Sequence, residues 1–589
     1  KKTSRLRSRE WFDIPGDPST TALHIERYTN FGISSEELRS GKPIIGIAQT
    51  GSDLVPCNRI HMNLALRVRE GIREAGAIAL EFPVHPIQES GKRPTAALDR
   101  NLQYLSLVEI LFGYPIDGVV LTIGCDKTTP ALLMAASTVD IPSICLSSGP
   151  MMNGYWKGER AGSGTIVWKA RKLLATGEID EEEFIKIVVD ATTSPGFCNT
   201  MGTATTMNSL AEGLGMSLPG CAAIPAPLSE RIEMSYRTGL HIVEMVKKDL
   251  TPSKILTRKA FENSIVLNSA IGGSTNAPIH INAIARHVGV ELEIEDWEKV
   301  GLEIPMLVNL QPGGKYLGED FHRAGGVPAV MNALLEAGKL HDSAITVNGK
   351  TVAENYAETT TQDTDVIRTF QNPMLENAGF IVLKGNIFDS AVMKTSVISD
   401  NFRSQYLDKP GSKNVFEVRA IVFEGPEDYR KRINDPQLNI NVDCILVIRG
   451  CGPVGYPGSA EVVNMQPPDK LIREGILELP TLGDGRQSGT SGSPSILNAS
   501  PESAVGGGLA LLKTGDMLRI DLNQGSLDVM LDKSELQKRH DELKTEEIEN
   551  QTPWQEIYRN TVGQLSSGGI IELAAKYRKI RNTIPRHSH

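Results

Sequence analysis

The sequence has few cysteines, and they are not paired along the chain. Its 589 residues include seven cysteines, and no two of them form a Cys-x-x-Cys motif. This absence counts against a zinc ribbon or a thioredoxin-like centre. Because the number is odd and nothing indicates secretion, we expect reduced thiols rather than disulfides. Clustered cysteines would then be metal ligands or small buried side chains.

Long apolar runs and excess positive charge are also missing. No apolar stretch approaches the roughly 18 residues that a membrane-spanning helix needs, and residues 1–16 lack the apolar core of a secretory signal. The formal net charge is −10, which argues against nucleic acid or an anionic membrane as the main partner. We therefore expect a cytoplasmic protein that acts on a small molecule.

A chain of this length exceeds one ordinary core, so two large domains are expected. Residues 1–384 alternate strand-like and helical segments, which predicts an α/β domain with a parallel sheet. From about residue 380, valine- and isoleucine-rich runs of strand length dominate. Residues 385–589 are therefore predicted to form a β-rich, barrel-like domain, with a hairpin at 517–531.

Individual elements follow from the spacing of apolar residues. In the N-terminal domain, strands are predicted at 43–50, 77–83, 116–123 and 141–147. Helices are predicted at 60–72, 95–112, 131–139, 166–176, 180–190, 228–247, 315–345 and 258–288, the last interrupted at 272–276. In the C-terminal domain, helices are predicted at 533–550 and 553–580.

The stretch Gly124-Cys125-Asp126-Lys127-Thr128-Thr129-Pro130 joins a predicted buried strand to a predicted helix. In open α/β sheets, ligands bind at the carboxyl ends of the strands. A thiol, a carboxylate and an amine are therefore expected together at such an edge. A soft ligand beside a hard one suggests two different metals, or a metal and a cluster.

Two further loops also place a cysteine before an asparagine, at Cys57 and Cys198. If these loops converge on Cys125, they supply three thiolates, whereas an iron–sulfur cluster normally takes four. Three protein ligands would leave one iron with an open position for a Lewis-acid role. The alternative is that these cysteines are structural, because buried cysteine is common.

Three carboxylates and one serine lie in loops flanked by glycine, proline or serine. Glu89, Asp126 and Glu461 are candidate ligands for a hard cation such as Mg²⁺, or they are solvated surface carboxylates. Lys127 could pair with Asp126 or serve as a base or covalent ligand. The Gly/Ser-rich stretch 485–492 is either a flexible turn or a loop that presents Ser488 as a nucleophile or base.

Six motifs, in this order, resemble the dihydroxy-acid dehydratase / 6-phosphogluconate dehydratase family over about residues 8–531. They are Pro-Cys57-Asn, Gly-Cys125-Asp-Lys-Thr-Thr-Pro, Cys198-Asn-Thr-Met-Gly-Thr-Ala, Gly-Gly-Ser274-Thr-Asn, Cys451-Gly-Pro-Val-Gly-Tyr-Pro-Gly and Ser488-Gly-Thr. The second and third forms are similar to the pentonate branch, which comprises D-xylonate and L-arabinonate dehydratases.

The resemblance implies two cofactors and a base. A 2Fe–2S cluster would be held by Cys57, Cys125 and Cys198. Mg²⁺ would be bound by Glu89, Asp126, Glu461 and a carbamylated Lys127, with Ser488 as the base and Thr490 close by. The family also implies a homodimer or homotetramer.

The resulting hypothesis is β-elimination of water from a 2,3-dihydroxy sugar acid, with Ser488 taking the Cα proton between the two domains. D-Xylonate is the first substrate expected, and L-arabinonate and D-gluconate are alternatives. A branched 2,3-dihydroxy acid of amino-acid biosynthesis is a second possibility. A redox-sensing iron–sulfur protein is a third, although it would need neither the carboxylates nor Ser488.

Overall fold

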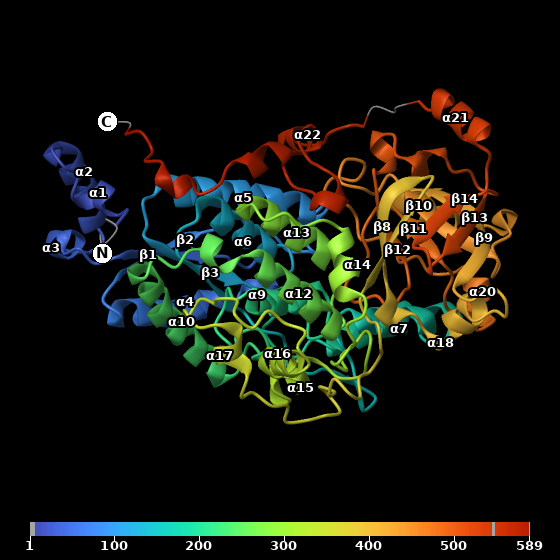
Figure 1. Ribbon diagram of the computed structural model, residues 1–589, viewed down its shortest axis with the longest axis horizontal. Coiled ribbons are helices and arrows are strands. Elements are labelled where there is room, and N and C mark those ends of the chain that lie inside the picture. The colour runs from blue at the N-terminus through green and yellow to red at the C-terminus, as the bar shows by residue number, and fades with distance from the viewer. Residues whose placement is uncertain (1–5, 545–547, 588–589) are drawn as a thin grey trace.

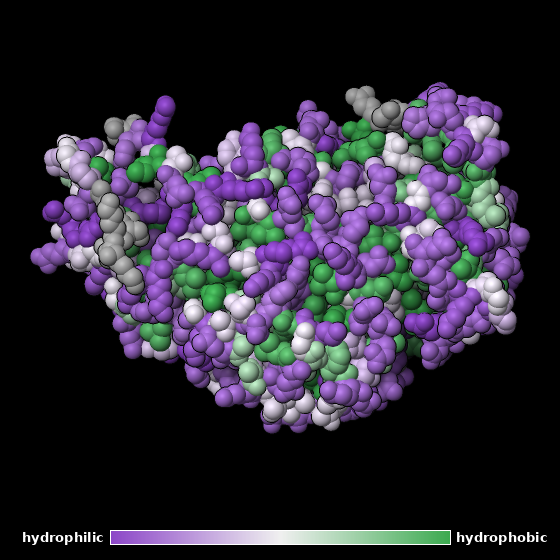
Figure 2. All heavy atoms as spheres, in the orientation of Figure 1, coloured by the Kyte–Doolittle hydropathy of each residue, from purple (hydrophilic) through white to green (hydrophobic). Residues whose placement is uncertain are grey.

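The computed structural model describes residues 6–544 and 548–587. Figure 1 shows two lobes, an N-terminal α/β lobe and a C-terminal lobe built around a barrel. This confirms the predicted fold class. Figure 2 shows hydrophilic side chains over most of the visible face, with small hydrophobic areas between them. Within the described ranges, no helix is both long and apolar enough to cross a bilayer.

A four-stranded parallel sheet forms the centre of the N-terminal lobe, in the order β2-β1-β3-β4. All six residues of β3 are buried, as expected of a central parallel strand covered on both faces. The order changes direction between β1 and β3, and that switch point is where open α/β sheets bind ligands. The strands are β1 (Ile44–Gln49), β2 (Ile78–Pro83), β3 (Gly118–Ile123) and β4 (Ser143–Ser147).

Helices cover both faces of this sheet (Figure 1). The predicted break at 272–276 is confirmed, because α12 ends at Ala270 and α13 begins at Ala277. The main helices are α4 (His61–Glu74), α5 (Ala96–Gly113), α6 (Thr128–Val139), α7 (Thr165–Thr176), α8 (Glu181–Asp190), α9 (Thr203–Gly213), α10 (Ser229–Lys247), α12 (Arg258–Ala270) and α13 (Ala277–Val288).

The predicted helix over 315–345 is wrong in its extent. Two shorter helices occur instead, α15 (Gly318–Arg323) and α16 (Gly326–Glu336). At the junction, Gly325 and the first residue of α16, Gly326, have φ of 117° and 60°. These values lie in the left-handed region, which a continuous right-handed helix cannot contain.

Eight strands of the C-terminal lobe close into a barrel in the order β10-β11-β12-β8-β7-β14-β13-β9. Apolar side chains such as Val418, Val447 and Leu518 fill a separate core there. The predicted hairpin is present as antiparallel β13 and β14. The strands are β7 (Phe380–Gly385), β8 (Phe388–Lys394), β9 (Val415–Glu424), β10 (Cys444–Arg449), β11 (Thr481–Gly483), β12 (Ile496–Ser500), β13 (Met517–Asp521) and β14 (Ser526–Val529).

The first barrel strand, β7, spans the expected domain boundary at 384/385. The last part of the chain leaves the barrel and returns to the N-terminal lobe (Figure 1). There, the Arg100 guanidinium donates to the carbonyl oxygens of Gly568 and Gly569 at 2.8 and 2.6 Å. The two lobes are therefore tied together by the C-terminal segment as well as by the connection before β7.

The two predicted C-terminal helices are wrong in length. Helix α21 (Lys533–Glu542) is shorter than the predicted 533–550, of which 545–547 lie outside the described residues. Helix α22 (Pro553–Arg559) is followed by short 3₁₀ turns rather than by a helix to residue 580. The backbone of Gly568 and Gly569 is left-handed, with φ of 95° and 57°, so a continuous helix cannot pass through these two residues.

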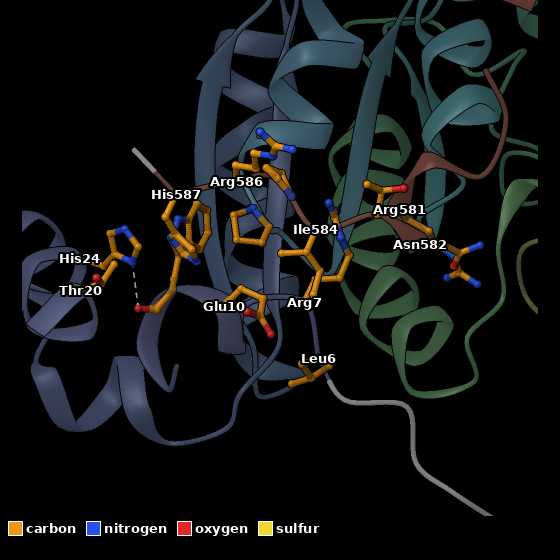
Figure 3. A pocket seen from close by; sticks show the side chains of 15 residues that line it. Leu6, Arg7, Glu10, Thr20, His24, Arg581, Asn582, Ile584, Arg586 and His587 are labelled. Atoms are coloured by element: carbon orange, nitrogen blue, oxygen red, sulfur yellow. Dashed lines mark hydrogen bonds between the residues drawn. The ribbon is translucent and has the colours of Figure 1, made fainter. Parts of the chain in front are cut away.

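A cavity of about 520 Å³ lies between the N-terminal arm and the C-terminal segment (Figure 3). Its wall includes Arg7, Trp11, His24 and Arg581. None of the predicted site residues lines it, so this cavity is not the predicted functional site.

Candidate functional site

The three loops with Cys57, Cys125 and Cys198 meet at the carboxyl edge of the parallel sheet. Cys57 lies in a 3₁₀ turn after β1, Cys125 follows β3, and Cys198 precedes α9. The side chain of Asn58 joins two of the loops, because its Oδ1 accepts the N–H of Cys125 at 2.6 Å. Asn199 links the third loop to the Gly-rich segment by accepting the N–H of Ser163 at 2.9 Å.

The cysteines are close enough to influence one another's ionisation. Burial, together with the nearby Cys198, raises the pKa of Cys57 to about 12. Burial also raises the pKa of Cys125, with Asp126 and then Cys57 adding to the effect. Without a cation, all three thiols are therefore protonated at neutral pH.

Two of the three sulfur atoms accept a hydrogen bond from a polar side chain. Gln88 Nε2 donates to Cys57 Sγ at 3.3 Å, and Ser163 Oγ donates to Cys198 Sγ at 3.4 Å. Donors to sulfur are typical of thiolates that ligate metal clusters. Three thiols from separate loops, two of them with donors already in place, fit a cluster better than they fit structural core packing.

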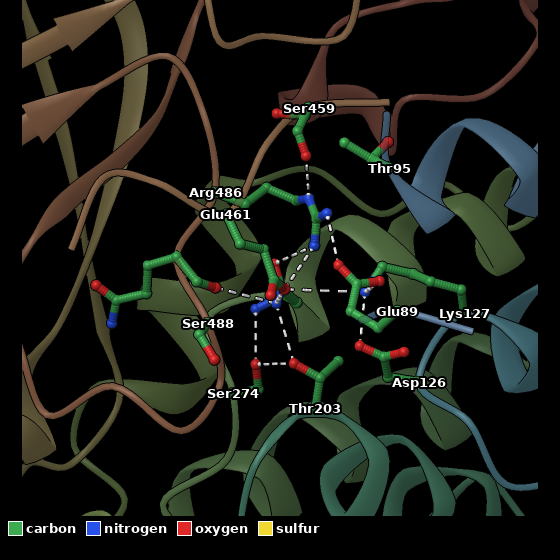
Figure 4. A network of polar contacts seen from close by, with 12 residues as sticks. Glu89, Thr95, Asp126, Lys127, Thr203, Ser274, Ser459, Glu461, Arg486 and Ser488 are labelled. Carbon is green, nitrogen blue, oxygen red and sulfur yellow. Dashed lines mark hydrogen bonds and ion pairs between the residues drawn. The ribbon is translucent and has the colours of Figure 1, made fainter. Parts of the chain in front are cut away.

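Beside the cysteines, Glu89, Asp126 and Glu461 bring their carboxylate oxygens within 4.8 Å of one another (Figure 4). The first two come from the N-terminal lobe and Glu461 from the C-terminal lobe. Lys127 points into this group and is fully buried. Its Nζ lies 2.7 Å from Asp126 Oδ2, 3.0 Å from Glu89 Oε2 and 3.9 Å from Glu461 Oε1.

A second buried cation, Arg486, completes the network (Figure 4). Its guanidinium lies 2.8 Å from Glu461 Oε1 and 3.4 Å from Glu89 Oε1, and its Nε donates to the Ser459 carbonyl at 2.8 Å. Asn276 Nδ2 also donates to Glu461 Oε1, at 2.9 Å. These contacts hold Glu461 across the boundary between the lobes.

The ionisation of the group follows from burial and these charges. Burial acts to raise the pKa of Glu89, but Lys127 and Arg486 outweigh it and hold that pKa below its usual range. Burial and the charge of Glu89 raise the pKa of Glu461 to about 7. Burial opposes the charge of Lys127, yet Asp126 and Glu89 keep its pKa above the usual value. Lys127 and Arg486 therefore balance two of the three carboxylates, and Glu461 is the one with a raised pKa.

The donor set fits a hard divalent cation. Although Glu89 Oε2 lies near Lys127 Nζ, it is buried and has no partner in hydrogen-bond geometry. Lys127 balances the charge of this oxygen, but its lone pairs stay open to a further ligand. Three carboxylates at this spacing are also the oxygen ligands that Mg²⁺ prefers.

Ser488 and Thr490 approach the same place from the barrel lobe. The two hydroxyl oxygens lie 2.9 Å apart, and the Thr490 N–H also faces Ser488 Oγ at 3.4 Å. Gly489 between them lies against α9, since a Cβ there would be 2.5 Å from the Thr203 nitrogen. Only glycine permits this approach, so the serine loop is seated directly beside the loops with the cysteines.

The structure thus brings all nine predicted site residues to one region between the lobes. Sequence reasoning gave no role to Arg486, Asn276, Asn58 or Gln88. One signal was present for Arg486: a group of three acids with a single lysine needs another cation, and Arg486 is two residues from Ser488. For Gln88 the sequence contains no comparable signal.

Comparison with known proteins is consistent with this arrangement. The model of the dihydroxy-acid/6-phosphogluconate dehydratase N-terminal domain matches residues 42–355, and that of the C-terminal domain matches residues 365–569. The chain is 60% identical to a D-xylonate dehydratase of Caulobacter vibrioides over 585 residues, which cover 99% of this chain and 98% of the relative.

Two other relatives are less similar. An L-arabinonate dehydratase of Rhizobium leguminosarum is 45% identical over 91% of this chain and 90% of its own. A dihydroxy-acid dehydratase of Pyrococcus abyssi is 36% identical over 88% and 92%, respectively. Both domain models and these full-length similarities show that the chain belongs to the dihydroxy-acid/6-phosphogluconate dehydratase family.

Proposed function

We propose that this protein is a sugar-acid dehydratase that converts an aldonic acid to a 2-keto-3-deoxy acid. The observation that supports it most directly is the meeting of three thiols, three carboxylates and Ser488 between the lobes. D-Xylonate is the first candidate substrate, because the relative that is 60% identical is a D-xylonate dehydratase. L-Arabinonate and D-gluconate are the alternatives.

The proposed cofactors are a 2Fe–2S cluster on Cys57, Cys125 and Cys198 and Mg²⁺ on Glu89, Asp126 and Glu461. Carbamylation of Lys127 would add a fourth oxygen ligand, since the amine and CO₂ form a carbamate with loss of a proton. When bound, the two centres would supply Lewis acidity at the substrate's acid group and at its leaving hydroxyl.

The protein's own residues perform the proton transfer. Ser488 takes the proton from Cα, the electron pair forms the Cα–Cβ double bond, and the C3–OH bond breaks. The proton and the hydroxide leave as water, and the enol then rearranges to the 2-keto acid. Serine is a weak base unless its alkoxide is stabilised, and the two Thr490 donors support that role.

The remaining expectations on partners are also part of the proposal. The net charge of −10 gives an anionic sugar acid no long-range attraction, so its carboxylate would have to be held by the local charges of the bound Mg²⁺ and Arg486. No nucleic acid or membrane partner is proposed. The protein is expected to act in the cytoplasm as a homodimer or homotetramer, which sedimentation analysis would test.

The deciding experiment is turnover of D-xylonate, L-arabinonate, D-gluconate and 2,3-dihydroxyisovalerate by cluster-loaded protein with Mg²⁺. Formation of 2-keto acid is measured for each. We expect the highest kcat/KM with a pentonate. Preference for 2,3-dihydroxyisovalerate would favour the branched-chain dehydratase instead, and a loaded protein that dehydrates none of the four would favour the redox sensor.

A further inference from the structure

The Ser488–Thr490 pair has a third member that none of the sequence motifs contains. Trp168, in the first turn of α7, donates its indole N–H to Thr490 Oγ1 at 3.1 Å. Thr490 Oγ1 in turn lies 2.9 Å from Ser488 Oγ. A chain of hydrogen bonds therefore runs from the N-terminal lobe to the proposed base.

The chemistry of the three groups gives this chain a direction. An indole N–H can only donate, so Thr490 Oγ1 is the acceptor in its bond with Trp168. The single hydroxyl proton of Thr490 is then free to be donated to Ser488 Oγ. A hydroxyl that accepts one hydrogen bond also becomes a better donor of the next.

Donation toward Ser488 matters most when Ser488 is ionised. An alkoxide can only accept, and hydrogen bonds to a charged acceptor are shorter and stronger than neutral ones. The Thr490 N–H, 3.4 Å from Ser488 Oγ, points to the same atom. Thr490 thus offers two donors to the state of Ser488 that removes a proton.

The local backbone holds these groups in place. The Ser491 N–H donates to the Ser488 carbonyl at 3.0 Å, which closes a tight turn around Gly489 and Thr490. At the start of α7, a Cβ on Gly164 would lie 2.5 Å from Thr490 Cγ2, and Gly164 has φ of 81°. Only glycine allows the helix that contains Trp168 to begin so close to Thr490.

Trp168 and Thr490 also line one side of a cavity of about 750 Å³, together with Thr165, Lys172 and Gln311. A molecule in this cavity would reach Thr490 alongside the indole ring. The two residues joined by this hydrogen bond therefore both form part of the cavity wall.

We propose that Trp168 is a positioning residue for proton abstraction, which orients the Thr490 hydroxyl to donate to Ser488 Oγ. The inference rests on the proposed dehydratase function and assigns to Trp168 a role in kcat rather than in substrate binding. Trp168→Phe keeps an aromatic ring, although a smaller one, and removes the N–H donor. Loss of one hydrogen bond that acts through a neighbour is expected to lower kcat by about three- to tenfold, with KM changed by less than about twofold.

A double-mutant cycle separates this role from general damage. In Thr490→Val protein there is no hydroxyl to orient, so adding Trp168→Phe should lower kcat no further. Thr490→Ser keeps the hydroxyl, and Trp168→Phe should lower its kcat as in the wild type. Trp156→Phe is the matched control, because this tryptophan also lies in the N-terminal lobe and its ring packs near Lys157 and Lys169. It should retain wild-type kcat.

Several outcomes would overturn the inference. They are an unchanged kcat in Trp168→Phe, a higher KM with unchanged kcat, or effects of Trp168→Phe and Thr490→Val on kcat that add fully in the double variant. If the Phe variant does not fold, Trp168→Leu, which also lacks a donor, takes its place in the same cycle. Wild-type protein that dehydrates no sugar acid would instead refute the proposed function, a result distinct from an active wild type with an unaffected variant.

Discussion

Replacing Arg486 with methionine gives a demanding test of the carboxylate site. Arg486 is 1% exposed and contacts both Glu461 and Glu89. Methionine has a similar stem but no charge, so Lys127 would be left to balance three buried carboxylates. Removing one partner of a buried ion pair typically costs about 3–5 kcal/mol. The metal-free variant is expected to lose that much unfolding free energy.

Added Mg²⁺ should restore more stability to this variant than to the wild type. In the wild type, Arg486 competes with a bound cation for Glu461 and Glu89. Without it, Mg²⁺ should bind more tightly, and each tenfold gain in affinity adds about 1.4 kcal/mol of stabilisation at saturating metal. Urea unfolding at about pH 8, with EDTA or with excess Mg²⁺, measures both quantities.

Arg231→Met provides the matched control. Arg231 is also fully buried, but its guanidinium donates to the backbone carbonyls of Cys221 and Ile224 at 2.7 and 2.5 Å. The Arg231→Met variant should lose unfolding free energy, and Mg²⁺ should stabilise it no more than it stabilises the wild type. If Mg²⁺ stabilises Arg486→Met no more than it stabilises the wild type, the carboxylates do not form the metal site.

Three further predictions concern the same region. Ser488→Ala should keep the iron content and visible absorbance of the loaded protein but lose turnover by at least about 100-fold; an active variant would show that another group is the base. Cys125→Ser should lose the visible absorbance, whereas Cys145→Ala, in β4, should keep it; equal spectra would exclude Cys125 as a ligand. In the native metal-free protein, Glu461 has a raised pKa of about 7. Between about pH 4.5 and 7, the folded protein therefore keeps a proton on Glu461 that the unfolded chain has already released. Unfolding free energy without metal should therefore fall as pH rises through this window, and Mg²⁺ affinity should fall as pH drops below about 7; calorimetry should find both trends weaker in Glu461→Gln.

The part of the site nearest to β3 could be predicted because its signals are local. A buried strand followed within a few residues by Cys125, Asp126 and Lys127 needs no long-range information. The two domain types were accessible for the same reason, since alternation of strands with helices and later runs of strands are local patterns. The break at Gly325–Gly326 was missed although the glycine pair is visible in the sequence, because glycine permits a left-handed backbone without requiring it.

Two residues without a predicted role, Arg486 and Trp168, depend on contacts across the lobes. Arg486 and Glu461 are 25 residues apart, and Glu89 is 397 residues from Arg486. Trp168 lies 322 residues from Thr490. No periodicity or motif links positions at such separations, so their pairing becomes visible only when the barrel is placed against the sheet.

One carboxylate connects the two proposed centres. Asp126 Oδ1 accepts from the Cys125 thiol at 3.3 Å, while its Oδ2 lies 2.7 Å from Lys127 Nζ. The three residues are consecutive at the end of one strand, so the soft and the hard ligands cannot move independently. The distance between the two centres, which a bound substrate would span, is thus set by the backbone of β3 and α6 rather than by flexible loops. This rigidity favours elimination across adjacent carbons, because the acid group and the departing hydroxyl must be held at the same time.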